Sequence, residues 1–257
     1  NEDMSAAITR GLSTGPIDVV MVGDVTVDDA IASVASTFGA LPPRGPEATP
    51  PAGSDQRRFP AGTAEPVRLT HNGPAEQALA YIAWPTTDAV TDRTEARRIS
   101  LLSAVLNLRV LEEIRERQAL AYGPGVGSSS SDTYPGYGSL VIRAETASDK
   151  LEAFYAAVDG IIAKLRDEPV TEDELTRARL PMIESLRRSQ ASNEYWLGQL
   201  SRVASHPEDI EQTLTHISDL EAVTTADIQT LARQYLRPDT AWRATVTSTS
   251  APAAAAQ

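Results

Sequence analysis

The chain has 257 residues, and its 23 Lys and Arg against 35 Asp and Glu give a formal net charge of −12. An acidic chain without a basic cluster is poorly suited to bind nucleic acid or an anionic membrane surface. The absence of cysteine excludes disulfides and thiolate metal sites, and no apolar run approaches the roughly 20 residues that a membrane span needs.

We interpret residues 1–41 as the C-terminal end of a preceding domain. The first residues have neither the basic nor the apolar region of a signal peptide, and they look like the interior of a longer chain. Residues 16–23, PIDVVMVG, form a β-branched run that predicts a buried strand. The following apolar spacing predicts a helix that Thr26 caps and Gly39 ends. One strand and one helix cannot bury themselves, so this piece needs a sheet to join.

A change of composition separates this piece from the rest of the chain. Residues 42–66 contain seven prolines and three glycines, which predicts a partly extended linker. Residues 249–257 are small and predict a disordered tail. Between them, we expect residues 67–248 to form one compact C-terminal domain.

Hydrophobic periodicity predicts eight elements within that domain. In chain order they are the strand Ala78–Trp84, the helix Asp92–Glu116, the strands Ala119–Ser128 and Gly138–Glu145, the helices Ser148–Arg166, Thr171–Ala204 and Thr225–Tyr235, and the strand Trp242–Val246. Pro181 is expected to kink or split the helix that Thr171 begins. This order predicts an α+β fold, in which helices cover one face of a mostly antiparallel sheet.

The histidines do not form a metal-binding motif. His71, His206 and His216 are not spaced as a pair on one helical turn, and neither H-E-x-x-H nor its inverse occurs. Each is interpreted as a surface histidine. A zinc site made wholly within this chain is not expected, since catalytic zinc needs three close protein ligands. The glycines in 123–127 miss the dinucleotide-binding spacing by one residue, so nucleotide binding is set aside. The residues thus predict no metal and no cofactor site within this chain.

The segment IRERQALAYGPGVG places Arg115 and Tyr122 seven positions apart across the end of a predicted helix. In the simpler interpretation, Arg115 satisfies the last helical carbonyls and Tyr122 is a strand residue. In the functional interpretation, the guanidinium and the phenol point into one cleft and donate to a carbonyl or an oxyanion. The glycines after Tyr122 would let an extended peptide approach the backbone. The residues alone leave both interpretations open.

Four segments resemble one peptidase family. LNLRVLEEIRERQALAYGPGVGSSSS resembles the R-x6-Y segment of the inverzincin-type zinc peptidases of the pitrilysin and insulinase group, family M16. TEDELTRARLPMIESLRRS and DLEAVTTADIQTLARQYL resemble later helices of that family, and PIDVVMVGDVTVDDAIASVASTFGALP resembles the end of its preceding domain. The matches follow the family order and cover nearly the whole chain outside the linker and tail. The resemblance implies an M16-peptidase or LuxS-like metallohydrolase fold.

The resemblance also implies a division of labour between two halves. Family members hold zinc and the catalytic base on an N-terminal domain, through H-x-x-E-H and a distal glutamate. Their C-terminal domain closes over it and contributes an arginine and a tyrosine, which Arg115 and Tyr122 match. Since this chain lacks H-x-x-E-H, the resemblance implies that Zn²⁺ binds outside it, on an N-terminal half or a partner subunit. The isolated chain would then be an inactive part of a zinc metalloendopeptidase.

Two further expectations concern partners and location. The substrate would be a peptide, and the alternative is a non-catalytic M16-like subunit that binds peptides or serves assembly. The Ala-, Pro- and Arg-rich, Lys-poor composition is typical of a high-GC bacterium. Because many bacterial relatives are exported, we expect a periplasmic or secreted protein, with the cytoplasm as the alternative.

Overall fold

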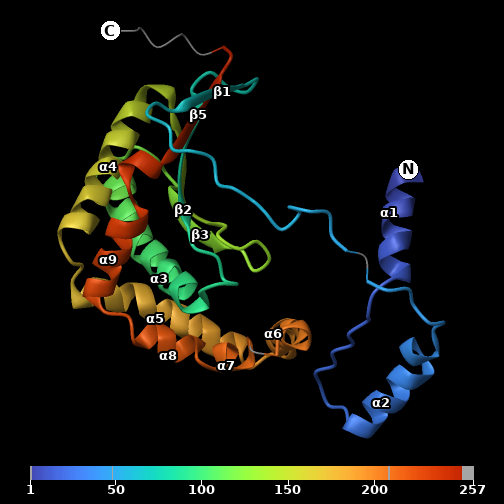
Figure 1. Cartoon of the computed structure of the whole chain (residues 1–257). Coiled ribbons are helices and arrows are strands. Elements are labelled where there is room, and N and C mark those ends of the chain that lie inside the picture. The colour runs from blue at the N-terminus through green and yellow to red at the C-terminus, as the bar shows by residue number, and fades with distance from the viewer. Residues whose placement is uncertain (1, 48, 208, 251–257) are drawn as a thin grey trace. The chain divides into compact units, whose positions relative to one another are not determined.

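The computed structural model describes residues 2–47, 49–207 and 209–250 (Figure 1). The chain divides into two compact units. Unit 1 comprises the described residues of Asn1–Ser54 and Glu184–Thr215, and unit 2 those of Asp55–Ile183 and His216–Gln257. In the described part of the chain, no helix has both the length and the apolar character to cross a membrane. Most of the tail predicted over 249–257 lies outside the described residues.

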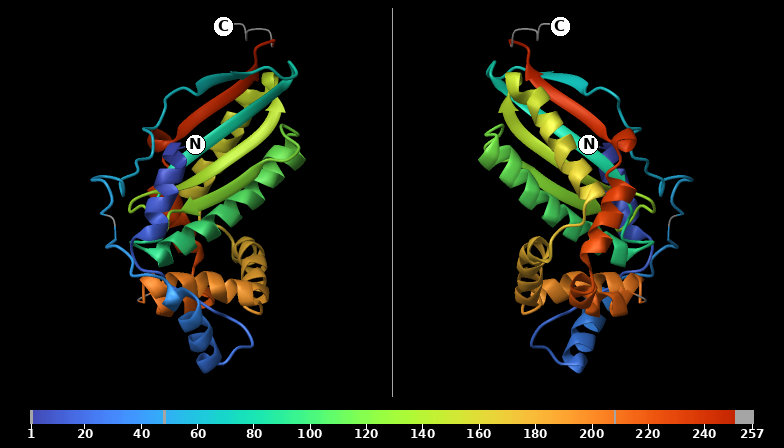
Figure 2. Two further views of the ribbon diagram at one scale, coloured as in Figure 1. Left: turned by 90° about the vertical axis from the view of Figure 1, so that its right-hand side faces the viewer. Right: turned by 90° about the vertical axis from the view of Figure 1, so that its left-hand side faces the viewer.

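A five-stranded sheet forms the centre of unit 2 (Figure 2). Its strands are β1 (Val67–His71), β2 (Gln77–Thr86), β3 (Gly125–Ser130), β4 (Gly138–Ala147) and β5 (Trp242–Ser248). They lie in the order β1-β5-β2-β4-β3, and only the β1–β5 pair is parallel. This topology confirms the predicted α+β fold with a mostly antiparallel sheet. The short strand β1 was not predicted, because VRLTH lacks a long apolar pattern.

Three helices cover one face of this sheet, as Figures 1 and 2 show: α3 (Arg93–Val110), α4 (Leu151–Asp167) and α9 (Thr225–Tyr235). Alternate residues of β2 point to opposite faces. Ala80, Ile82 and Trp84 on the covered face are therefore buried, whereas Leu79 and Tyr81 are only partly buried. The largest partners of these residues in the core are Ile99, Leu101, Leu102, Leu106, Ile114, Leu140, Ile142, Phe154, Leu165 and Leu175.

The helix predicted over Thr171–Ala204 is in fact two helices, α5 (Glu172–Ser189) and α6 (Asn193–Ser205). Pro181 was expected to kink or split this helix, and it does not split it, because α5 continues through this proline. The kink stays a prediction. Buried Ala178 and Ile183 lie on either side of it and keep the helix packed, although the proline removes one helical hydrogen bond. The interruption comes later, where Ser192 accepts the Tyr195 backbone N–H and caps α6.

Four shorter elements also lie in the part of the chain after β4. They are α7 (Asp209–Leu214), α8 (His216–Glu221) and the 3₁₀ turns η3 (Ser148–Lys150) and η4 (Pro238–Thr240).

Unit 1 begins with α1 (Glu2–Ser13) and also contains α2 (Val27–Ser36) and the 3₁₀ turn η1 (Phe38–Ala40). Thr26 caps α2 as predicted, since its side chain accepts the Asp29 N–H. The predicted strand over 16–23 is not present: residues 16–22 have no regular secondary structure and pair with no strand among the described residues. A strand needs a neighbour for its backbone N–H and C=O groups.

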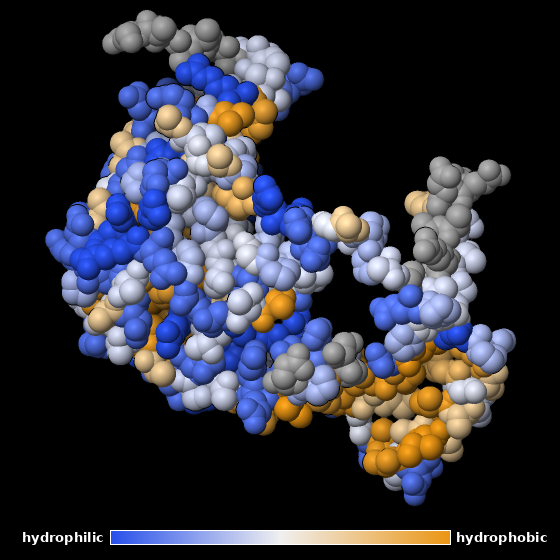
Figure 3. Space-filling view, viewed as in Figure 1, coloured by the Kyte–Doolittle hydropathy of each residue, from blue (hydrophilic) through white to orange (hydrophobic). Residues whose placement is uncertain are grey.

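The consequence is an exposed apolar surface on unit 1. Ile17, Val19 and Met21 occupy alternate positions of this segment and are 36–43% exposed. No residue of α2 is buried, and hydrophobic side chains gather over this part of unit 1 in Figure 3. Such a surface on a folded chain indicates a place where another element binds.

Candidate functional site

Arg115 lies on a π-helical turn that extends α3. The helix is α-helical to Val110, and residues Leu111–Arg117 continue it as the π-helix η2. π-Helical turns are rare and occur frequently at functional sites. The side chain of Ile114 is fully buried and anchors this turn in the core. The predicted helix therefore exists, with Asp92 as its N-cap, but the sequence did not reveal the change in helical pitch.

A tight reversal then returns the chain towards η2. The Leu120 N–H donates to the Ile114 carbonyl at 2.8 Å. Ala119, inside the reversal, has a φ of +47°, which is uncommon for a residue with a side chain. The Ala119 carbonyl accepts a hydrogen bond from Lys150 Nζ at 2.8 Å. A group from a distant part of the sequence therefore helps to hold this unusual conformation.

The far side of the reversal is fixed to β4. Ala121 forms a bridge with Thr146, whose Oγ1 donates to the Leu120 carbonyl at 2.6 Å. Leu120 and Ala121 are buried, but the next residue, Tyr122, is 85% exposed. The predicted strand Ala119–Ser128 is corrected accordingly, because β3 begins only at Gly125. A firmly held backbone thus presents Tyr122 to solvent.

The structure brings the two predicted site residues together. The guanidinium carbon of Arg115 lies 5.0 Å from the centroid of the Tyr122 ring, within the range of a cation–π interaction. Among the described residues, Arg115 forms no ion pair and no hydrogen bond to a helical carbonyl, whereas Arg117 pairs with Glu112 and Glu113. The simpler interpretation, in which Arg115 satisfies the end of the helix, does not match this geometry.

Glu113 explains why the two arginines differ. Gln118 Nε2 donates to its Oε1 at 2.6 Å, and Arg117 donates to its Oε2 at 3.3 Å. The hydrogen bond from Gln118 lowers the pKa of Glu113, desolvation opposes this, and the positive charges of Arg117 and Lys164 lower it further. The ionised carboxylate therefore holds the turn and engages Arg117, which leaves the guanidinium of Arg115 available.

The strand that follows Tyr122 carries little side-chain bulk. A Cβ atom placed on Gly123, Gly125 or Gly127 would meet no heavy atom within 4 Å. β3 also lies at an edge of the sheet, and Asn107 accepts its Val126 N–H at 3.2 Å. Space beside the backbone is therefore available, and the approach of an extended peptide stays a prediction.

The histidines are separate from this pair. His71 is bound locally, with Nδ1 accepting the Gly73 N–H at 2.8 Å and Nε2 lying 3.0 Å from the Gln77 carbonyl oxygen. His206 is exposed. The part of the chain that the structure describes contains no group of three or more His, Asp or Glu residues that could hold a metal ion.

The surface interpretation is wrong for His216. This residue begins α8 and is only partly exposed, beside Arg97 and Asp219, which form an ion pair at 2.5 Å. Burial, together with the positive charge of Arg97, lowers the pKa of His216 to about 4. The ring is therefore neutral at pH 7 and packs as part of the helical layer.

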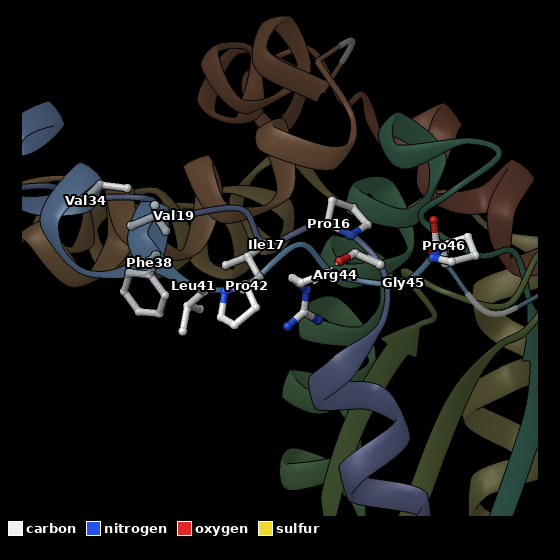
Figure 4. Close-up of a pocket in the computed structure, with 13 residues that line it drawn as sticks. Pro16, Ile17, Val19, Val34, Phe38, Leu41, Pro42, Arg44, Gly45 and Pro46 are labelled. Carbon is white, nitrogen blue, oxygen red and sulfur yellow. Dashed lines mark hydrogen bonds between the residues drawn. The ribbon is translucent and has the colours of Figure 1, made fainter.

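A cavity of about 590 Å³ in unit 1 is a different kind of site (Figure 4). Its labelled side chains are mostly apolar, with Ile17 and Phe38 among them. Arg44 also lines it, but this guanidinium donates to the carbonyls of Thr14 and Gly15 at 2.5 and 2.7 Å, just beyond the end of α1. Such a cation neutralises the negative end of a helix dipole. The cavity therefore offers apolar contact rather than acid or base chemistry.

A protein-family model described as "Peptidase M16 inactive domain" matches residues 5–182, more than half of the chain. The chain belongs to the peptidase M16 family. This match confirms the family that the R-x6-Y segment predicted. It also identifies this M16 chain as a domain of the C-terminal, inactive type.

Two curated relatives of this M16 chain are described as uncharacterized zinc proteases. The one from Rickettsia felis is 30% identical over 128 residues, which are 48% of this chain and 30% of the relative. The one from Mycobacterium leprae is 24% identical over 223 residues, 85% of this chain and 48% of the relative. The chain thus spans about half, or less, of the length of these relatives.

Solved structures support the fold of this M16 chain. The crystal structure of a peptidase M16 inactive domain from Pseudomonas fluorescens matches it with a TM-score of 0.70 at 22% identity. The match covers 90% of this chain and 54% of the other. At this level of identity the similarity establishes the architecture, whereas the roles of Arg115 and Tyr122 have to be argued from their own geometry.

Proposed function

We propose that this chain is the substrate-clamping half of a zinc peptidase that hydrolyses peptides. The proposal is carried by one observation, the exposed guanidinium of Arg115 held 5.0 Å over the ring of Tyr122 on a firmly anchored turn. Neither the guanidinium nor the phenol hydroxyl has a hydrogen-bonding partner among the described residues. Both can therefore donate to a substrate carbonyl and, more strongly, to the oxyanion that develops when that carbonyl is attacked.

The zinc ion of the complete enzyme would bind outside this chain. The described residues lack a suitable set of ligands, while the longer relatives from Rickettsia felis and Mycobacterium leprae are named zinc proteases. We infer that an N-terminal half, or a partner subunit, contributes Zn²⁺ and the catalytic base. The chemistry of bond cleavage would start there, and this chain alone would be inactive.

The proposed division into an N-terminal half and this C-terminal half also gives the domain boundaries that we propose. Residues 1–41 would complete the preceding domain, 42–66 would be a linker, 67–248 the C-terminal domain, and 249–257 a tail. The support comes from residues 16–22, whose alternating apolar side chains are exposed and whose backbone forms no ladder among the described residues. A periplasmic or secreted location is proposed because the composition is typical of a high-GC bacterium and many bacterial relatives are exported.

Reconstitution tests this function. A quenched fluorescent peptide library would be incubated with the chain alone, with its N-terminal half plus Zn²⁺, and with both together. Hydrolysis only by the complete mixture supports the proposal. If the N-terminal half has an intact zinc motif and the mixture binds peptides without hydrolysing them, the chain is instead a non-catalytic binding subunit. The inactive-type domain description gives that alternative its support.

A further inference from the structure

We propose that one face of the unit 2 sheet binds a large apolar side chain of the substrate peptide. The proposal rests on the function proposed above, because it concerns the same peptide and names a feature that selects it. The face in question lies opposite α3, α4 and α9, and we call it the open face. Within the described residues of unit 2, no helix covers it, as the two views of Figure 2 show.

The strand pairing arranges the side chains of the open face in rows that cross the sheet. Residues directly opposite each other on neighbouring strands point to the same face. One row contains, from β4 through β2 and β5 to β1, Glu145, Leu79, Val246 and Leu69. The next row contains, in the same order of strands, Arg143, Tyr81, Ala244 and Val67. The apolar side chains of both rows therefore form one continuous surface.

This apolar surface is accessible to a ligand. Leu69 and Val67 are 49% and 38% exposed, and the other large members are partly exposed. Trp242 extends the surface, because its ring lies 5.8 Å from the ring of Tyr81 in an edge-to-face arrangement. Aromatic rings arranged in this way also favour contact with a further ring. We define the apolar platform as Val67, Leu69, Leu79, Tyr81, Trp242 and Val246.

The apolar platform is continuous with the candidate site. Ala121 bridges to Thr146 on β4, so the next residue, Tyr122, lies beside the end of the row that Glu145 begins. Neighbouring strands are about 4.8 Å apart, which places β2 and β5 about 10 and 14 Å from the chain at Tyr122. An extended peptide advances about 3.3 Å per residue. If Arg115 and Tyr122 hold the scissile carbonyl, a side chain roughly three or four residues away reaches the platform.

The size of the platform favours a peptide over a folded partner. Its six side chains are few beside the roughly 20–30 residues that each partner contributes to a standard protein–protein interface. Arg143 and Glu145 lie between the platform and Tyr122, both are exposed, and neither forms an ion pair among the described residues. Their charges offset each other, so the apolar character of the peptide decides its selection. An aromatic side chain such as phenylalanine suits this surface best.

Binding by the chain alone tests the platform without zinc or hydrolysis. The probes are short alanine–serine peptides, either without an aromatic residue or with a single phenylalanine. Labelling of tryptophan with ¹⁵N follows the indole N–H of Trp242, and a Trp242→Phe variant identifies its signal. We expect a saturable shift of this signal with the phenylalanine peptide and none with the alanine–serine peptide.

A pair of leucine variants provides the matched comparison. Leu79→Gln should weaken binding of the phenylalanine peptide about tenfold, because it removes apolar contact from the centre of the platform. Leu180→Gln changes an exposed leucine on α5 and should leave the affinity unchanged. Urea denaturation of both variants shows that each remains folded, since both leucines lie at the surface.

Cleavage by the reconstituted enzyme tests the spacing. The phenylalanine is moved one position at a time along the peptide, and mass spectrometry identifies the products. We expect the cleaved bond to move with the phenylalanine and to stay roughly three or four residues from it. Leu79→Gln should lower kcat/KM about tenfold for the phenylalanine peptide and should not change it for the alanine–serine peptide.

The outcomes separate this proposal from the function on which it rests. Binding that Leu79→Gln weakens, without hydrolysis by the mixture, supports the platform and counts against the peptidase function. Hydrolysis at a position that ignores the phenylalanine, or equal binding by Leu79→Gln and the parent, overturns the platform and leaves that function standing. If the N-terminal half displaces the bound peptide in the absence of Zn²⁺, the open face is an interface between the halves, which also overturns the proposal.

Discussion

The Leu120 N–H donates to the carbonyl of Ile114 at 2.8 Å, and this bond closes the reversal that brings Tyr122 beside Arg115. Ile114 is fully buried, so the hydrophobic core, rather than a loose loop, fixes the positions of Arg115 and Tyr122. A catalytic group must be held within a fraction of an ångström to be effective. This dependence on the core suits the pair to the transition-state binding that we propose for it.

Replacing Tyr122 with phenylalanine should lower kcat of the reconstituted enzyme by about 10²–10³, the usual effect of losing one oxyanion donor. The change removes the hydroxyl but keeps the ring beneath Arg115, and KM should change little. Steady-state hydrolysis of a fluorogenic peptide measures both constants. An unchanged kcat would show that the phenol does not donate to the transition state.

Two arginines on the same turn provide a matched comparison. Arg115→Gln should reduce kcat/KM by roughly 10–100-fold, because a hydrogen bond from a charged donor contributes about 1.5–3 kcal/mol. Arg117→Gln removes an equal charge, but from a side chain already engaged by Glu112 and Glu113. Its kcat/KM should stay within about twofold of the parent. Equal losses in the two variants would assign the effect to general electrostatics.

His216 should make the stability of the chain depend on pH. Burial and Arg97 lower its pKa to about 4, although the charge of Asp219 opposes the shift. The unfolded chain therefore takes up a proton as the pH falls through about 6.5, and the folded chain does so only near 4. Since the unfolded state binds more protons in this window, the free energy of unfolding falls with falling pH.

The size of this effect can be isolated with a His216→Asn variant. Between pH 7 and pH 4.5, the parent should lose about 2–3 kcal/mol of unfolding free energy more than the variant does. Urea denaturation at both pH values measures the difference. The pH-dependent contributions of all other titratable groups are the same in the two proteins and therefore cancel. Parallel losses would show that His216 titrates normally.

The extent to which the sequence predicted the structure depends on how local each feature is. The helix Thr225–Tyr235 has the predicted bounds, because the signals that set its first residue are local. Thr224 and Asp227 form a capping box at its N-terminus. The strand expected over 16–23 did not form, since a strand is completed by distant residues. Distant contacts also explain why Pro181 does not split the helix: the burial of α5 offsets the local cost of the proline, which is all that the sequence shows.

In the candidate site too, the local features could be predicted from the sequence and those that depend on distant contacts could not. The residues at its two ends, Arg115 and Tyr122, follow from the resemblance to the family, because their spacing is a sequence property. The π-helical turn and the positive φ of Ala119 could not be predicted from the sequence, since they depend on contacts from Lys150 and Thr146.

Gly138, at the start of β4, should be intolerant of a side chain. A Cβ there would lie 2.1 Å from the Thr87 carbonyl oxygen, and backbone cannot move aside as a flexible side chain can. Gly138→Ala should therefore destabilise the chain by about 2–4 kcal/mol, in the range of severe packing and backbone strain. Gly127→Ala on β3 is the control, because its Cβ meets nothing within 4 Å. Similar urea midpoints for the two variants would contradict this reading of β4.

Residues 16–22 should gain hydrogen-exchange protection when the N-terminal half is added. Their backbone forms no ladder among the described residues, and Ile17, Val19 and Met21 are exposed. In the chain alone, these amides should exchange at close to the rates of an unstructured peptide. Pairing with a sheet of the other half would bury the alternating apolar side chains and slow alternate amides by about 10²-fold or more, since only those directed at the neighbour are bonded. Exchange measured by mass spectrometry, with the edge strand β3 as an internal reference, separates this effect from general stabilisation. Slow exchange already present in the chain alone would show that the segment needs no partner, and the proposed boundary at residue 41 would then lose its support.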